Sequence, residues 1–265
     1  MKKVFLISVC ALCFTLALSG QALATKPKAP AKKASKVVPK AQWMKIITKL
    51  DKTEAQAKDF KGELVLVLIN KAGKKRQRRA IFFQKGTTKR LMQFKYPASF
   101  AGLTVLIRGA SMHLYLPQFR KVKKIAAHVK NQPFMGTDLS FDDMGALSYR
   151  PYYRVVKVIK LDKGYRLTLK PKPGVSKPYS KLVIRVRPDG FLKKVAFFNK
   201  AGKKIKTMKR SNFKKIGKWT FPCLVEVHDL LSNHRTQVIM RKIQIATGIS
   251  NRIFKKRYLK RTLSL

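Results

Sequence analysis

The carboxylates of one loop are the clearest chemical feature of this chain. Only 11 of the 265 residues are Asp or Glu, and three of them, Asp138, Asp142 and Asp143, lie within six positions. The preceding 74 residues contain no acid at all. We expect these carboxylates to cap backbone N–H groups or to pair with Arg120 and Lys121. Calcium is an alternative partner, although the spacing is not that of an EF-hand loop.

The other reactive side chains form no catalytic pattern. The four histidines lack metal-ligand spacing, no serine lies in a nucleophile elbow, and no phosphate-binding loop is present. Glu226 and Asp229 are three positions apart on an expected strand, so they face opposite sides and make a poor acid–base pair. Cys223 lies beside bulky apolar residues and is expected to be a buried, unreactive thiol. The sequence therefore predicts no enzyme, no cofactor and no bound metal.

The charge of the chain indicates anionic partners. Its 61 Lys and Arg residues give a formal net charge of +50, which bears on partners and solubility rather than on fold. Candidate partners are anionic lipid head groups, lipopolysaccharide and nucleic acid. Basic runs at residues 74–79 and 255–261 are interleaved with aromatic residues that could stack on nucleic-acid bases, namely Phe82, Phe83, Phe254 and Tyr258. Polyanion binding through this basic surface is therefore the main alternative function.

The first 24 residues have the features of a cleaved signal peptide. Lys2 and Lys3 precede an uncharged apolar run at residues 4–18, and Ala22-Leu23-Ala24 forms a small-x-small cleavage site. The apolar run is shorter than the roughly 20 residues that span a bilayer, so an uncleaved anchor is the weaker interpretation. We expect export with cleavage after Ala24, which argues against nucleic acid as the physiological partner.

The next segment is expected to be a basic leader. Residues 25–40 consist mainly of Lys, Ala and Pro and contain no acid, as in a flexible linker. This leader is either a spacer or an electrostatic tether to an anionic membrane, where each Lys contributes about 1 kcal/mol. Residues 41–265 then form one domain, because all-β chains of this length are commonly single domains.

Periodicity predicts one helix followed by many strands. In residues 41–53, Trp43, Ile46, Ile47 and Leu50 share one helical face, which either packs on the core or covers a ligand cavity as a lid. A two-residue period then predicts strands at residues 63–70, 79–84, 89–95, 103–108, 111–116, 120–127, 153–161, 165–170, 181–187, 192–199, 204–213, 221–230 and 235–246. A short closing helix with Ser250 as N-cap is expected at residues 250–260.

Such a meander leaves more than one architecture open. Turn signals recur about every 8–12 residues, which is typical of an antiparallel sheet or barrel. Barrels of more than about eight strands enclose a cavity or stay open, and a double-sheet sandwich is the alternative. Residues 63–70 are bulky on both faces, so one face could line a cavity for an apolar ligand.

Segments spread over most of the chain carry a family resemblance. They are residues 106–109, 112–117, 120–122, 131–138, 140–144, 179–184, 198–203 and 216–219. In these segments the chain resembles the LolA/LolB-like periplasmic proteins that sort outer membrane lipoproteins. The resemblance implies a mainly β fold with a few helices: an open, strongly curved antiparallel half-barrel with helices plugging its concave face. The chain departs from the family in being far more basic.

The resemblance also implies a function and partners. Members of the family shield the acyl chains of lipoproteins or lipids during transfer through the periplasm to the outer membrane. The implied partners are these acyl chains, an anionic membrane surface, and an exporter of the resistance-nodulation-division type or an outer membrane acceptor. Physics supports such a role, because each CH₂ exposed to water costs about 0.8 kcal/mol. A carrier needs an apolar concavity and a way to open, but no catalytic chemistry.

Two groups of residues are the site candidates. The cavity wall is assigned to Trp43, Ile46, Ile47, Leu50, Leu66, Phe82, Tyr115, Phe134 and Met135. The loop at the cavity rim is assigned to Pro117, Arg120, Lys121, Asn131, Gln132, Gly136, Asp138, Asp142 and Asp143. The alternative is that this central block serves only as a folding nucleus.

Overall fold

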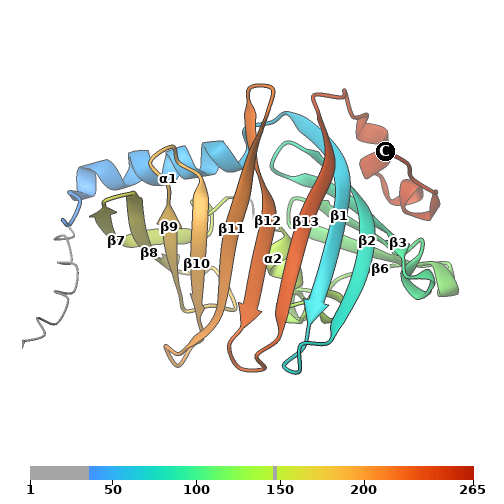
Figure 1. The fold of residues 1–265 in the computed structure, drawn as a ribbon, viewed down its shortest axis with the longest axis horizontal. Coiled ribbons are helices and arrows are strands. Elements are labelled where there is room, and N and C mark those ends of the chain that lie inside the picture. The colour runs from blue at the N-terminus through green and yellow to red at the C-terminus, as the bar shows by residue number, and fades with distance from the viewer. Residues whose placement is uncertain (1–35, 146–147) are drawn as a thin grey trace, which may run out of the picture. The chain divides into compact units, whose positions relative to one another are not determined.

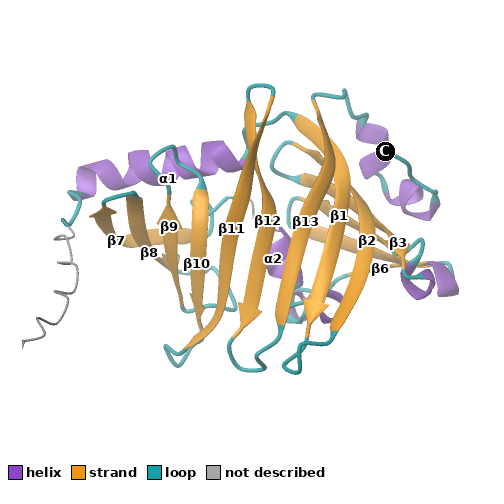
Figure 2. Ribbon diagram, viewed as in Figure 1, coloured by secondary structure: helices purple, strands orange, loops and turns teal. Residues whose placement is uncertain are grey.

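A computed structural model describes residues 36–145 and 148–265. The predicted signal peptide and residues 25–35 of the predicted leader lie outside the described residues. The described part is mostly β, with a 13-stranded sheet and two α-helices (Figures 1 and 2). None of the helices in these two ranges is both long and apolar enough to cross a membrane.

The strands form two consecutive series. The first contains β1 (Asp59–Ile69), β2 (Lys75–Lys85), β3 (Lys89–Tyr96), β4 (Thr104–Arg108), β5 (Ser111–Leu116) and β6 (Lys121–Lys124). The second contains β7 (Tyr153–Leu161), β8 (Gly164–Pro171), β9 (Lys181–Val186), β10 (Leu192–Phe198), β11 (Lys204–Ile216), β12 (Trp219–Asp229) and β13 (Arg235–Ile245). Every predicted strand is present, with ends that differ by a few residues.

The sheet is open and entirely antiparallel. Its order is β6-β5-β4-β3-β2-β1-β13-β12-β11-β10-β9-β8-β7, so each series is a simple meander. The two meanders meet where β1 pairs with β13, which we call the seam. The edges are β6 and β7, and they do not pair with each other. The predicted open half-barrel is therefore confirmed, and the double-sheet sandwich is wrong.

The basic strand predicted at residues 120–127 is shorter than expected. Only Lys121–Lys124 pair, with β5, and they form an edge of the sheet. Arg120 has φ 49° at the end of a preceding 3₁₀ turn, so it cannot continue a strand. Three of the four β6 residues are exposed lysines, which discourage pairing with another chain at this edge.

Helical segments fill the concave face of the sheet. α1 (Lys40–Glu54) closely matches the predicted helix, and its Ile47 and Leu50 are buried against the second meander. Residues 125–145 and 148–152, which we call the crossing segment, lie between the edge strands β6 and β7 in the sequence and include α2 (Phe141–Gly145). Its Phe134 and Phe141 are buried against the first meander. The predicted helical plug is thus confirmed, and it consists of α1 and the crossing segment (Figure 1).

The C-terminal segment covers the other face of β2–β5. It forms two short 3₁₀ helices, η5 (Asn251–Phe254) and η6 (Lys256–Lys260), whose Phe254 and Leu259 pack on Phe83 and Leu91. The Ser250 side chain accepts a hydrogen bond from the backbone N–H of Arg252, so the predicted N-cap is confirmed. Because the C-terminal segment covers this second face of the sheet, β2 has apolar residues on both of its faces.

Candidate functional site

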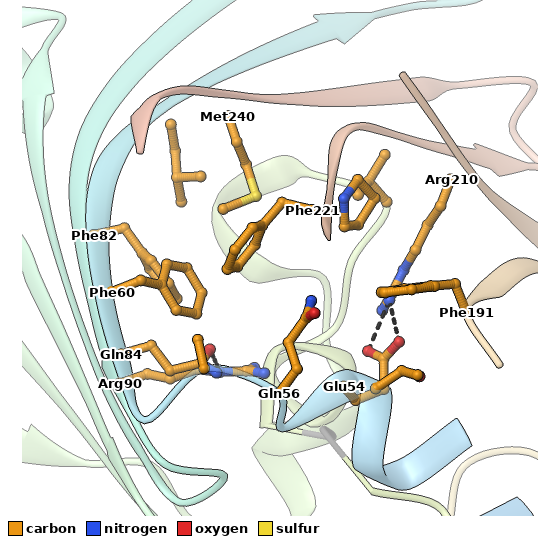
Figure 3. Close-up of a pocket in the computed structure, with 15 residues that line it drawn as sticks. Glu54, Gln56, Phe60, Phe82, Gln84, Arg90, Phe191, Arg210, Phe221 and Met240 are labelled. Carbon is orange, nitrogen blue, oxygen red and sulfur yellow. Dashed lines mark hydrogen bonds and ion pairs between the residues drawn. The ribbon is translucent and has the colours of Figure 1, made fainter. Parts of the chain in front are cut away.

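A cavity of about 170 Å³ lies beneath the seam, between the sheet and the end of α1 (Figure 3). Aromatic and aliphatic side chains form most of its wall, including Phe60, Leu64, Phe82, Phe191, Phe221, Val225 and Met240. The polar side chains are few and come from the end of the helix, the turn after it and the sheet: Thr53, Glu54, Gln56, Gln84, Arg90 and Arg210. An apolar wall with a few convergent polar groups is typical of a ligand-binding site.

A β-bulge at the seam lies beside the cavity. The register of β1 against β13 shifts between Lys61 and Glu63. Glycine is required at position 62, since a Cβ there would lie 2.9 Å from the backbone oxygen of Arg241. Bulges bend their strands and often lie next to functional sites. Phe60 and Leu64, which flank the bulge on the inner face of β1, both line the cavity.

An ion pair ties the end of α1 to the sheet. The Glu54 carboxylate accepts two hydrogen bonds of 2.7 Å from Nη1 of Arg210 on β11. The Glu54 side chain is 6% exposed, so the pair is shielded from water. Burial alone would lower the pKa of Arg210, but the nearby Glu54 raises it above its ordinary value. Nε of Arg210 is buried and has no hydrogen-bond partner among the described residues.

Arg90 provides a second guanidinium group at the cavity, on a half-buried side chain. Its Nε donates to Oε1 of Gln84 at 3.1 Å, and its Nη1 donates to the Met144 carbonyl. Within residues 36–145 and 148–265 it forms no salt bridge with a carboxylate. Burial lowers the pKa of Arg90 to about 9, Glu54 opposes this change, and Arg210 adds to it. Arg90 is therefore still protonated at neutral pH.

The clustered acids of the crossing segment bind the second meander. Asp138 accepts hydrogen bonds from Thr236 Oγ1 at 2.7 Å and lies 2.8 Å from Nδ1 of His234. Asp142 pairs with Lys177 at 2.9 Å. The prediction of defined partners is confirmed. No three His, Cys, Asp or Glu side chains gather into a metal-binding group in the described part of the chain.

Asp143 has both roles that the sequence predicted for these acids. It pairs with Lys206 at 2.5 Å, and it accepts a 2.8 Å hydrogen bond from the backbone N–H of Ser140. The Ser140 hydroxyl in turn accepts a 3.1 Å hydrogen bond from the Asp143 N–H, which completes a capping box at the start of α2. The predicted partners Arg120 and Lys121 are wrong, because Arg120 ends the 3₁₀ turn before β6, Lys121 begins β6, and both side chains are exposed.

The predicted wall residues are distributed over three regions. Trp43, Ile46, Ile47 and Leu50 pack in the core beneath α1, and Leu66, Phe134 and Met135 pack in the core beneath the crossing segment. Tyr115 contacts the core on the opposite face, beneath the C-terminal segment. Of the nine, Phe82 is the one that lines the cavity.

The predicted rim residues shape the backbone at the ends of β5 and in the crossing segment. Pro117 begins a 3₁₀ turn, Arg120 ends it with a positive φ, and Lys121 begins β6. Asn131 ends the 3₁₀ helix η3 (His128–Asn131), and the Gln132 carbonyl accepts a hydrogen bond from the Phe141 N–H. Gly136 has φ 70°, which glycine adopts without strain. Asn131, Gln132 and Gly136 therefore shape the backbone of the plug, whereas Pro117, Arg120 and Lys121 lie outside it. None of these residues lines the cavity beneath the seam.

Sequence reasoning missed the three ionic groups of the cavity. A signal was present for Glu54, which lies four positions after Leu50 and so on the apolar face of the helix. Arg210 lies two positions after the buried Met208 and so on the same face of β11. Arg90 likewise lies on the same face of β3 as Met92 and Phe94. The signal for this site was therefore a charged residue at a position where the periodicity of the helix or strand predicts a core residue.

Comparisons with known proteins support the fold. A family model described as "-like: Uncharacterized protein" matches residues 86–261, which is well over half of the chain. The search of curated proteins found no match. Three solved structures are each similar to this chain over 81% of its length.

The three structures cover nearly all of their own chains. A Vibrio parahaemolyticus domain described as an outer membrane lipoprotein-sorting protein is 23% identical, with a TM-score of 0.72 over 97% of that chain. A DUF1329 family protein from Desulfovibrio piger is 23% identical, with a TM-score of 0.76 over 96% of that chain. A LolA superfamily protein from Nitrosomonas europaea is 18% identical, with a TM-score of 0.67 over 98% of that chain. These likenesses establish a shared fold.

Proposed function

This chain belongs to the protein family whose model spans residues 86–261 and has the fold of the LolA superfamily, and on this basis we propose that it is a periplasmic carrier of acyl chains. The cargo would be the acyl chain of a lipoprotein or lipid on its way to the outer membrane. The observation that carries the proposal is the aromatic cavity beneath the seam, at the end of the helical plug. The carrier acts by burial and release and catalyses no reaction.

The size of the cavity requires the plug to move. Its 170 Å³ is close to the roughly 150 Å³ that holds one benzene molecule. Drug-sized ligands occupy about 300–1,000 Å³. In the proposed function this structure corresponds to a closed state, and a long acyl chain would enter when α1 or the crossing segment moves away from the sheet.

The free energy gained by burying an acyl chain is compared with the cost of separating the plug from the sheet. Burying a 16-carbon chain contributes about 12 kcal/mol, at about 0.8 kcal/mol for each CH₂. Breaking a buried ion pair costs about 3–5 kcal/mol. Glu54–Arg210 and Asp143–Lys206 join the plug to the sheet, and in each pair the carboxylate is buried. The gain from the cargo thus exceeds the cost of separating both pairs.

Native mass spectrometry of the mature protein, followed by organic extraction, tests this function. We expect a co-purifying lipid that is lost in Phe82→Asp, which places a charge in the cavity, and in Val225→Trp, which fills it. Phe119→Asp is the matched control, because Phe119 is 64% exposed on a surface turn. Circular dichroism confirms that each variant is folded. A protein that carries no lipid from cells and takes up none in vitro would overturn the proposal.

A second candidate function, attachment to an anionic membrane, has its own observation. Arg108, Lys124 and Lys256 surround the buried His113 in a hollow whose lining contains no acid. Co-sedimentation with phosphatidylglycerol vesicles, compared with phosphatidylcholine vesicles, tests this surface. Binding should weaken in Lys124→Gln/Lys256→Gln and with added salt. An exporter of the resistance-nodulation-division type or an outer membrane acceptor would then meet the carrier at the membrane.

Nucleic acid is not supported as a partner. Two of the aromatic residues that would stack on bases are buried, since Phe83 lies beneath the C-terminal segment and Phe254, in that segment, packs on the sheet. Phe82 lines the cavity instead. Three of the four aromatic residues are therefore core or cavity residues. Tyr258 is half-buried, with the guanidinium groups of Arg257 and Arg261 over its ring, so base stacking at the second basic run stays a prediction.

A further inference from the structure

We propose that the ligand of the cavity carries a free carboxylate, which Arg90 and Arg210 bind, and that its apolar tail contacts the aromatic wall. The inference rests on the proposed carrier function and narrows its cargo to a monoanionic amphiphile such as a fatty acid. A lipoprotein acyl chain, which is attached through an uncharged ester or amide, would leave this charged end of the cavity unused.

The two guanidinium groups face the same space. Arg90 reaches the cavity from β3 and Arg210 from β11, on either side of the seam, and both line it (Figure 3). Their hydrogen bonds to the described residues use Nε and Nη1 of Arg90 and Nη1 of Arg210. Nε of Arg210 is buried without a partner among the described residues. Donors therefore remain on Arg210 after all of its protein hydrogen bonds are counted.

The charges of the cavity do not balance. Two arginines line it but only one carboxylate, that of Glu54, and this carboxylate binds Arg210. The partners of Arg90 are an amide oxygen and a carbonyl oxygen, which are neutral. An unpaired buried charge is costly, and an anion that enters the cavity removes that cost. A ligand with a single negative charge would make the cavity neutral.

The shape of the site favours a carboxylate with an apolar tail. A guanidinium group offers planar, forked donors that match the two oxygens of a carboxylate. Beyond the arginines, Phe60, Phe221 and Met240 form an apolar wall (Figure 3). The head group and the beginning of the tail fit the closed cavity, and the remainder of a longer tail requires the plug to open.

Calorimetric titration of the delipidated mature protein with decanoate and decanol tests the inference. The two ligands share their tail and differ in charge. We expect decanoate to bind at least tenfold more tightly than decanol. Arg90→Gln should bring the ratio of the two dissociation constants to within twofold of one, whereas Arg90→Lys, which keeps the charge, should retain part of the preference.

A control separates this site from the general positive charge of the protein. Lys193→Gln removes one exposed charge from β10, away from the cavity lining, and should leave the ratio unchanged. Equal binding of decanoate and decanol would overturn the inference and leave the carrier function standing. A preference that survives in Arg90→Gln would also overturn it. If neither ligand binds, the proposed function itself fails.

Discussion

The ammonium group of Lys206 lies 2.5 Å from Oδ2 of Asp143, and both side chains are less than 10% exposed. Lys206 belongs to β11 and Asp143 to the crossing segment, so this contact joins the plug to the sheet. The hydroxyl of Tyr179 lies 3.2 Å from the same carboxylate. Burial and the negative charge of Asp143 raise the pKa of Tyr179, which keeps this hydroxyl protonated as a donor.

Removing one member of this pair should destabilise the protein more than removing both. Asp143→Asn or Lys206→Met alone leaves a buried charge without its partner, so each should lower the free energy of unfolding by about 3–5 kcal/mol. The double variant should recover part of this loss. Urea unfolding of the four proteins gives the coupling energy. Additive effects would show that the two side chains are energetically independent.

Glu54→Gln should loosen the end of α1 and strengthen anion binding. The change leaves the two half-buried arginines of the cavity without a carboxylate, so decanoate should bind more tightly than it does to the original protein. Hydrogen exchange in the last turns of α1 should become faster, because the pair with Arg210 is lost. Glu63→Gln is a suitable control, since the partner of Glu63, Lys242, is exposed. Weaker decanoate binding in Glu54→Gln would contradict the expected charge balance.

Decanoate binding should fall at alkaline pH. The pKa of Arg90 is lowered to about 9, so above that pH the free protein loses the proton that holds the carboxylate. If the protonated form alone binds the anion, affinity should drop about tenfold for each further pH unit. Decanol affinity, measured in parallel, reports any general change in the protein. A flat profile between pH 8 and pH 10 would exclude Arg90 as the titrating group.

His113 should make the protein less stable in mild acid. Burial, with Lys256, Lys124 and Arg108 nearby, lowers the pKa of His113 below 6.5. Below pH 6.5 the unfolded state therefore binds more protons than the folded state, and stability falls as the pH decreases through the folded-state pKa. His113→Gln should reduce the difference in unfolding free energy between pH 7.5 and pH 5. An identical difference in both proteins would show that other groups cause it.

The fold could largely be predicted from the sequence because its elements are regular. The alternation of apolar residues in residues 153–161 gives β7 with the predicted ends, and the apolar face of Ile47 and Leu50 gives α1. Each hairpin is local, so neighbouring strands follow from their order along the chain. The pairing of β1 with β13 does not follow in this way, and the resemblance to a known family was needed to choose an open sheet.

The candidate site was predicted less well for a physical reason. Trp43, Leu66 and Phe134 are apolar, and an apolar residue looks the same in sequence whether it faces a cavity or a filled core. Tyr115 was assigned to the wrong face because the C-terminal segment provides a second apolar surface. The acids of the crossing segment were correctly expected to have partners, but those partners lie far away in the sequence, such as Lys177 in the loop between β8 and β9.

The strand order also affects how the protein folds. Contacts inside each meander join neighbouring stretches of chain, whereas the seam joins Phe60 to Ile245 and Ile69 to Arg235. Closing so long a loop costs entropy, and topologies with distant contacts fold slowly. We therefore expect the two meanders to form first and the seam last. Since the cavity is lined by residues of both meanders, an emerging polypeptide would be unable to take up cargo until its final strand had been added.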